Sequence, residues 1–212
     1  MYQISQSVTM KKIVFFFAFL SLFACQEKAV LLPQIDQTIQ ATVVDHSPIY
    51  MFFNKEKSDT LVAVNRKNSI SSTNWIFNID KRLPLRLVVP ELQKLLAKKV
   101  GSAHKSAASE NYFSYSDSIH KQLAFLPITK MRFTLGKPKF GVRVYFDTNN
   151  QVFVNEVAVN NENFASYLAQ FSNKPSLPLT FCFAKNSSYE NFVKGLVLAQ
   201  SQGLQVVQVF VY

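Results

Sequence analysis

Few residues of this chain combine a reactive side chain with the spacing that chemistry requires. The two cysteines are Cys25 and Cys182, and the three histidines lie far apart, without the spacing of a metal site. The glycine-rich phosphate-binding motifs and the G-x-S-x-G nucleophile motif are absent from the sequence. The sequence therefore predicts no catalytic residue, cofactor or metal ligand, but it does not exclude an enzyme.

Cys25 is the residue with the strongest chemical expectation, because it stands where an apolar run ends. Lys11 and Lys12 precede an uncharged stretch, Ile13–Leu20, and small residues then lead into the cysteine. This is the charged, apolar and small-residue pattern of a secretory signal peptide, and the run is too short for a comfortable membrane-spanning helix. The alternative is an apolar helix that remains in place as a membrane anchor.

The stretch Leu22-Phe23-Ala24-Cys25 resembles a bacterial lipobox, in which the cysteine thiol is diacylated and becomes the mature N-terminus. Phe23 is bulkier than the usual occupant of its position. Two acyl chains anchor a protein stably, whereas one holds it only marginally. We therefore expect a signal peptide at 1–24, lipidation of Cys25, and a membrane-anchored lipoprotein outside the cytoplasm, on the periplasmic face or the cell surface.

The mature chain is basic, and most of the excess lies in its first half. Residues 25–135 hold fifteen basic and nine acidic residues, and residues 136–212 hold six and four. Such a balance often indicates nucleic acid, but an exported protein meets anionic lipid head groups, lipopolysaccharide or wall polymers instead. We expect no nucleic-acid partner. The simpler interpretation, which we favour over a polyanion site, is that the lysines and arginines keep the surface hydrated.

Composition and patterning divide the mature chain into a tether and two domains. Hydrophobic residues make up 48% of the chain and aromatic residues 14%, which is enough for a packed core. Residues 25–47 are interpreted as a tether that lets the folded part stand off its membrane. A first α/β domain is expected at 48–135 and a second at 136–212.

The first domain is predicted to contain a hairpin, two helices and a strand. Its first helix is expected to begin at Pro90, because proline suits the first helical position, and to end before Gly101. Apolar residues at helical spacing predict the second helix before Pro127. In order, the predicted elements are strands at 48–53 and 60–64, helices at 90–100 and 116–126, and a strand at 130–135.

The second domain repeats an order of hairpin, helix, strand, helix and strand. Asn161 is expected to cap its first helix and Ser188 its second, and Gly203 ends the second. This order makes a complete two-layer α/β unit. The predicted elements are strands at 142–146 and 151–154, a helix at 161–168, a strand at 179–184, a helix at 189–200 and a strand at 206–212.

The second domain resembles the periplasmic domain of the ExbD/TolR family over about the last third of the chain. The matching stretches are Gln151-Val152-Phe153-Val154-Asn155-Glu156, Leu179-Thr180-Phe181-Cys182-Phe183-Ala184, Tyr189, and Gln202-Gly203-Leu204-Gln205-Val206-Val207. The resemblance implies a role in biopolymer transport or envelope maintenance. The family normally carries an intramembrane aspartate for proton-driven coupling, but Ile13–Phe23 holds no acid, and Lys185 stands where the family often has one. The resemblance therefore implies the folded domain without the energy transduction.

The first domain is interpreted as a diverged copy of the same unit. In this alignment Ile49–Val64 corresponds to Val142–Val154, and Ser116–Leu135 corresponds to Ser188–Tyr212. Asn74–Ile79 is then an insert, and no third strand is assigned. The alternative is an unrelated domain whose order matches by chance. The predicted fold class is thus α+β, with two tandem ExbD/TolR-like repeats, each a two-layer α/β unit.

Two aromatic features and the second cysteine have both a functional and a structural interpretation. The cluster Tyr112-Phe113-Ser114-Tyr115 and the single tryptophan, Trp75, could stack on wall sugars, but core packing is the favoured role. Cys182 lies in an apolar run, where a thiol behaves as a small hydrophobe rather than a nucleophile.

Two classes of function follow from these observations. The first is a lipid-anchored envelope interaction module that binds an envelope protein, a second copy of itself or a wall polymer. The final strand is its expected interaction edge, with Val207, Val209 and Val211 as candidate residues, because no later strand can cover it. The second is an envelope enzyme acting on a wall or sugar polymer, with Asp80 or Asp117 as a catalytic acid.

Overall fold

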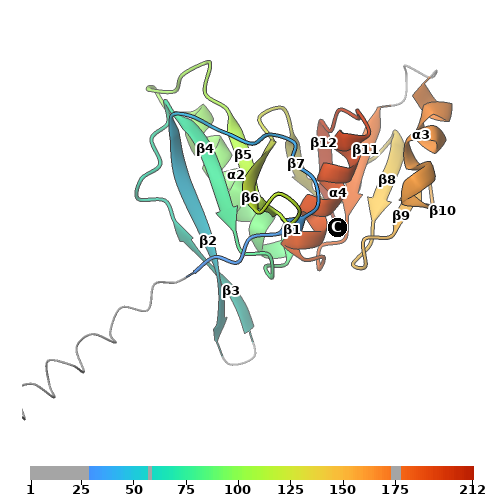
Figure 1. The fold of residues 1–212 in the computed structure, drawn as a ribbon, viewed down its shortest axis with the longest axis horizontal. Helices are drawn as coiled ribbons and strands as arrows, with labels where there is room; N and C mark the ends of the chain where they lie inside the picture. Colours follow the sequence, from blue (N-terminus) through green and yellow to red (C-terminus); the bar gives the residue numbers. More distant parts are fainter. Residues whose placement is uncertain (1–28, 57–58, 173–177) are drawn as a thin grey trace, which may run out of the picture.

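The computed structural model describes residues 29–56, 59–172 and 178–212, and over these ranges the protein is α+β. Two mixed β-sheets lie side by side, with helices packed against them (Figure 1). The predicted α+β class is confirmed, whereas the two tandem ExbD/TolR-like repeats stay a prediction. Cys25 and the expected signal peptide lie outside the described residues, so their predictions stay as stated.

The first sheet is built from residues 34–127. Its strands are β1 (Gln34–Ile35), β2 (His46–Glu56), β3 (Asp59–Asn65), β4 (Asn74–Ile79), β5 (Asn111–Asp117) and β6 (Gln122–Pro127). β2 pairs antiparallel with β3 and parallel with β4, and β4 pairs parallel with β5. β6 pairs antiparallel with β5, and the short β1 pairs with the end of β5. The predicted hairpin at 48–64 is therefore present as β2 and β3.

The second sheet has the order β10-β9-β8-β11-β12-β7. Its strands are β7 (Arg132–Leu135), β8 (Val142–Phe146), β9 (Val152–Val154), β10 (Val157–Val159), β11 (Leu179–Phe183) and β12 (Gln208–Val211). β8, β11, β12 and β7 are parallel, and β9 and β10 are antiparallel additions at one edge. β7, which the sequence places in the first domain, is thus part of the second sheet.

Two long helices, α2 (Leu85–Val100) and α4 (Tyr189–Ser201), pack with the same stripe of side chains. Apolar residues at spacings of three and four bury one face of a helix. The buried positions are Leu85, Val88, Val89, Leu92 and Leu95 in α2, and Tyr189, Phe192, Val193, Leu196 and Ala199 in α4. Each position of one stripe lies 104 residues from its counterpart. The shorter α3 (Phe164–Ser172), which follows η2 (Asn161–Asn163), lies beside β8 and β9 (Figure 1).

Four strands and one helix recur in the same order in both halves. β3-β2-β4-β5, with α2 between β4 and β5, has the same strand directions as β9-β8-β11-β12, with α4 between β11 and β12. The second half adds β10, η2 and α3 between its hairpin and its third strand. The segment Asn74–Ile79, expected to be an insert, is in fact the third strand of the first half.

The two halves meet where α2 and α4 begin. The first turn of any helix leaves backbone N–H groups without partners inside the helix. Here each helix donates two of them to carbonyls of the loop before the other helix, in a reciprocal set of 2.8 to 3.1 Å bonds. These bonds run from Leu85 N to Ser187 O, Tyr189 N to Leu83 O, Arg86 N to Lys185 O, and Glu190 N to Lys81 O. The contact is self-complementary, as in a two-fold dimer.

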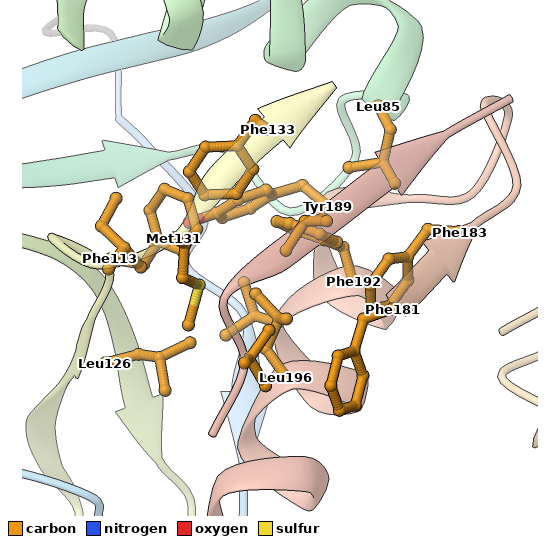
Figure 2. Close-up of a cluster of buried hydrophobic side chains, with 14 of the residues drawn as sticks. Leu85, Phe113, Leu126, Met131, Phe133, Phe181, Phe183, Tyr189, Phe192 and Leu196 are labelled. Atoms are coloured by element: carbon orange, nitrogen blue, oxygen red, sulfur yellow. The ribbon is translucent and has the colours of Figure 1, made fainter. Parts of the chain in front are cut away.

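A single hydrophobic core joins the two halves (Figure 2). The ring of Phe113 on β5 lies 5.5 Å from that of Tyr189 and 6.0 Å from that of Phe192, both on α4. Phe133 on β7 lies 6.4 Å from Phe192. Aromatic pairs at these separations contribute beyond the area they bury. The two halves are therefore held together by apolar packing as well as by the backbone bonds.

The helix predicted at 116–126 is wrong, because this segment is the turn and second strand of a β-hairpin. β6 pairs along its whole length with β5, and two apolar residues of this segment, Ile119 and Leu123, are exposed. Asp117 accepts hydrogen bonds from the N–H groups of Ile119 and His120, which starts the turn. Lys121 completes it with a φ of 55°. Apolar residues three and four apart also fit a turn followed by a strand.

The first helix begins earlier than predicted, and the expected tether is part of the fold. α2 starts at Leu85, so Pro90 lies inside the helix. The segment from Ala29 onward is not a free tether, because β1 pairs with β5 and the N–H of Ile39 donates to Tyr115 Oη at 2.8 Å. We call residues 29–45 the strap.

The final strand is not an exposed edge. β12 lies between β11 and β7, with parallel pairing on both sides. Val209 and Val211 are buried in the core, and Val207 precedes the strand. The expectation of an interaction edge at these three valines is therefore wrong, because β7, from earlier in the chain, covers the edge that the sequence order leaves open.

Candidate binding face

The outer face of the second sheet carries an aromatic surface that the helices do not cover. Side chains alternate along a strand, so residues between the buried core positions point to the other face. Val144 and Phe146 of β8 face the core, which leaves Arg143 and Tyr145 on the outer face. By the same alternation Phe153, Phe210 and Tyr212 also lie there. We call this surface the open face.

A hollow of about 320 Å³ lies on the open face. Its lining residues are Lys137, Arg143, Tyr145, Phe153, Glu156 and Tyr212. The rings of Tyr145 and Tyr212 are stacked, with centroids 5.6 Å apart and planes 24° from parallel, and Phe153 lies 6.3 Å from Tyr145. Adjacent aromatic rings of this kind form an apolar floor on which a flat ring or an extended chain can lie.

Charged groups surround this aromatic floor. Arg143 Nη2 lies 2.8 Å from Glu156 Oε1, and Lys137 Nζ lies 5.2 Å from the centre of the Tyr212 ring. The turn between β9 and β10 presents Glu156, because Asn155 and Glu156 both have positive φ, as the two-residue hairpin turn requires. The hollow thus offers apolar rings with two cations and one anion at its rim. These groups suit recognition of a polar or anionic ligand rather than bond making.

Cys182 lies on the open-face side of β11 but is fully buried. Burial raises the pKa of its thiol to about 11, so the thiolate that would act as a nucleophile is scarce at neutral pH. Partial burial also raises the pKa of Tyr145 and of Tyr212 above the ordinary value, which keeps both hydroxyls protonated. The expectation that Cys182 is a packing residue agrees with this position.

Asp80 is a structural carboxylate that fastens the strap. It is fully buried and pairs with Arg82 in two bonds of 2.8 Å, and it also accepts the N–H of Leu31. Burial alone would raise the pKa of Asp80, but the hydrogen bonds from Arg82 and Leu31 hold it below its ordinary value. Asp80 is not among the residues that line the hollow.

Asp117 has the same kind of role at the end of β5. Its carboxylate accepts hydrogen bonds from the Thr38 hydroxyl on the strap, from the ring of His120 and from two backbone N–H groups of the turn. These bonds, that of Thr38 first, hold the pKa of Asp117 well below its ordinary value. Both acids considered as catalysts are thus committed to holding the strap and the turn.

The residues singled out from the sequence do not come together at one site. Trp75, Phe113 and Tyr115 are buried in the core, and Tyr112 packs with Ile76 and Phe125 on the other side of the first sheet, so the core-packing interpretation of this cluster is confirmed. The residues of the hollow were missed. Alternation in 142–146 places Tyr145 opposite the core, but only the pairing of β8, β9 and β12 shows that Phe153 and Tyr212 lie beside it.

Comparison with protein-family models and with curated proteins finds no match to this chain. Among the described residues, no group of three or more histidine, cysteine, aspartate or glutamate side chains is placed to hold a metal ion. In the same part of the chain, no helix has both the length and the apolar character needed to cross a membrane.

Proposed function

We propose that this protein is a lipid-anchored module of the cell envelope that binds its partner on the open face. In this proposal the chain is a lipoprotein acylated at Cys25 and held on a membrane outside the cytoplasm. Its two halves are tandem repeats that resemble the ExbD/TolR periplasmic domain, and its partner is an envelope protein or a wall polymer. It serves a transport or envelope-maintenance system without being the proton-driven subunit.

The observation that carries the binding role is the hollow with its stacked tyrosines. Side chains as large as Tyr145 and Tyr212 usually bury their rings against a core, yet here both belong to an uncovered sheet face beside Lys137 and Arg143. Binding is favoured over catalysis because the two candidate acids, Asp80 and Asp117, are occupied by structural hydrogen bonds.

The binding role is tested with the chain from residue 26 onward, which retains every described residue. Purified wall glycan is titrated, and crosslinking to intact envelopes is carried out in parallel. Tyr145→Ser combined with Tyr212→Ser should weaken retention at least tenfold, because the aromatic floor is lost. Tyr50→Ser is the matched control, since Tyr50 stacks with Phe52 at 5.9 Å on the other sheet. Equal retention by the variant and the control would contradict the proposal.

The anchor is tested separately in cells that process lipoproteins. A radiolabelled fatty acid should label the wild-type full chain and should not label Cys25→Ser. Equal labelling of the two would refute the lipoprotein assignment. It would leave the binding role of the open face to be judged by its own experiment.

A further inference from the structure

Very little chain separates the proposed lipid anchor from the folded body. Leu31 is already fixed, because its N–H donates to Asp80 Oδ2 at 3.3 Å and its carbonyl accepts the N–H of Lys81 at 2.8 Å. The six Cα–Cα steps from Cys25 to Leu31 can span at most about 20 Å when the chain is fully extended. If Cys25 carries the acyl chains, the surface around Leu31 must therefore lie next to the membrane.

This surface is basic. The loops that precede α2 and α4 contact the first turns of these helices here. Loops and first turns together carry four cations, Lys81, Arg82, Arg86 and Lys185, against two acids, Asp80 and Glu190. Asp80 is paired with Arg82, and Glu190 lies 3.6 Å from Lys81. Arg86 and Lys185 are exposed and, among the described residues, form no ion pair with a carboxylate. We call the four cations and Leu31 the basic end.

The basic end is suited to a flat charged surface rather than to a single bound anion. The N–H groups that a helix start usually offers to an anion are already used, because the first N–H groups of α2 and α4 bond to each other's loops. The remaining attraction comes from side-chain cations spread over two loops and the first turn of α2. Leu31, 46% exposed, adds an apolar group between them and the anchor.

We propose that the basic end docks on anionic lipid head groups of the leaflet that holds the acyl chains. The inference rests on the proposed lipid anchor and adds the orientation of the molecule on its membrane. Lysines and arginines near an anionic leaflet are attracted to it, and the attraction falls off within a Debye length. The connection to Cys25, at most about 20 Å long, allows the basic end to approach the leaflet to within that distance.

The first test measures binding of the unanchored chain, from residue 26 onward, to vesicles. Vesicles with about one third phosphatidylglycerol should bind it at least tenfold more strongly than vesicles of phosphatidylcholine alone, and salt should abolish the difference. Arg86→Glu with Lys185→Glu should remove the preference. Lys98→Glu with Lys105→Glu is the control, since it changes the same charge at exposed positions. Lys98 lies about 20 Å from the start of α2 at 1.5 Å per residue.

A second measurement locates the contact on the acylated full-length protein. In anionic vesicles Lys185 should be acetylated by a water-soluble reagent at least fivefold more slowly than in detergent, while Lys98 and Lys105 should react equally in both. Equal rates at all three lysines, or equal loss of vesicle binding in both charge-reversal pairs, would overturn the proposal. Fatty-acid labelling of Cys25 is read separately, so a failed anchor and a failed docking surface are distinguishable.

Discussion

Two buried tyrosines differ in whether their hydroxyl has a hydrogen-bond partner. Tyr115 Oη accepts the N–H of Ile39, whereas Tyr189 Oη is buried with no hydrogen-bond partner within the described structure. A buried polar group without a partner costs about 1–3 kcal/mol. We expect Tyr189→Phe to raise the free energy of unfolding by about 1 kcal/mol and Tyr115→Phe to lower it by a similar amount. Urea denaturation of both variants checks this, and the same sign in both would contradict it.

Lys99 is a buried cation that lacks a carboxylate partner in the described part of the chain. It is 5% exposed, its Nζ donates to Glu110 O and Asn111 Oδ1 at 3.0 Å, and it lies 5.1 Å from the Trp75 ring. Burial lowers its pKa to about 8, from an ordinary value of 10.5. Between these two values the unfolded chain binds the proton and the folded chain does not, so stability rises with pH there.

The lowered pKa of Lys99 predicts how the stability of the protein changes with pH. Relative to Lys99→Met, the wild-type free energy of unfolding should increase by about 2 kcal/mol between pH 8 and pH 10.5, and the difference should level off below about pH 7. Lys98→Met, at the exposed neighbouring position, should show no such change. Urea denaturation at several pH values measures both differences. A wild-type stability that falls relative to Lys99→Met over this range would show the sign to be wrong.

For single residues, the sequence predicts which side chains are buried, but it does not predict which side chains lie next to each other. Trp75 and Cys182 lie in apolar runs, and both are in the interior. Tyr145 and Tyr212 stand 67 positions apart in the sequence. Their rings stack because only one strand, β11, lies between β8 and β12 in the sheet. No local pattern contains that pairing, so the hollow could not be found without the sheet order.

Among the elements, α4 packs on its sheet through a glycine. A Cβ added to Gly195 would lie 2.9 Å from the Phe183 ring and 3.0 Å from the Phe146 ring, and these two rings are stacked 4.8 Å apart. Alanine is favoured over glycine in a helix by about 1 kcal/mol, but overpacking a core costs about 1–3 kcal/mol. The close approach to two fixed rings decides which effect is larger.

We therefore expect Gly195→Ala to lower the free energy of unfolding by about 1–2 kcal/mol. Gly101→Ala is the control, because the added Cβ would lie no closer than 3.4 Å to another atom, and this residue should tolerate the change. Thermal unfolding of both variants gives the comparison. An increase in stability for Gly195→Ala would mean that α4 is free to move away from the sheet.

The sequence predicts a helix whose apolar residues keep the helical period over its whole length. It does not predict an element that is decided by pairing with another strand. The helix at 189–200 has a capping serine and a full apolar stripe, and it is present as α4. The segment 116–126 has too few apolar residues to distinguish a helix from a turn followed by a strand, and pairing with β5 decides the outcome. Pro90 is placed inside α2 because the apolar stripe extends more than one turn further back, to Leu85.

For the whole molecule, the alignment of the two halves that the sequence suggests differs from the one that the helix contacts suggest. The sequence-based alignment matches Ser116–Leu135 with Ser188–Tyr212. The buried faces of the helices and the reciprocal backbone hydrogen bonds instead match α2 with α4. The correspondence of the two helices is hard to see in the sequence, because different residues precede them. Pro84 stands before α2 and Ser188 before α4. The two halves then share one core, so neither is a separate domain in the way that the boundary at 135 implies.

That shared core leads to a prediction about unfolding. Trp75, the single tryptophan, lies in the first half, so its fluorescence reports that half alone, whereas circular dichroism at 222 nm reports both. Phe146 lies in the second half, packed against Phe164, Phe183 and Gly195 of the same half. A smaller residue in place of Phe146 therefore removes contacts within the second half and leaves the contacts of Trp75 unchanged.

Phe146→Leu should lower the melting temperature by several degrees, because a loss of about 1–2 kcal/mol shifts a domain of this size by about 2–4 °C per kcal/mol. If the rings of Phe113, Tyr189 and Phe192 couple the halves, Trp75 fluorescence and circular dichroism should shift by the same amount and remain superimposed. The exposed change Lys139→Ala should move neither curve. A Trp75 transition that stays at the wild-type temperature while circular dichroism divides into two steps would mean that the halves unfold independently.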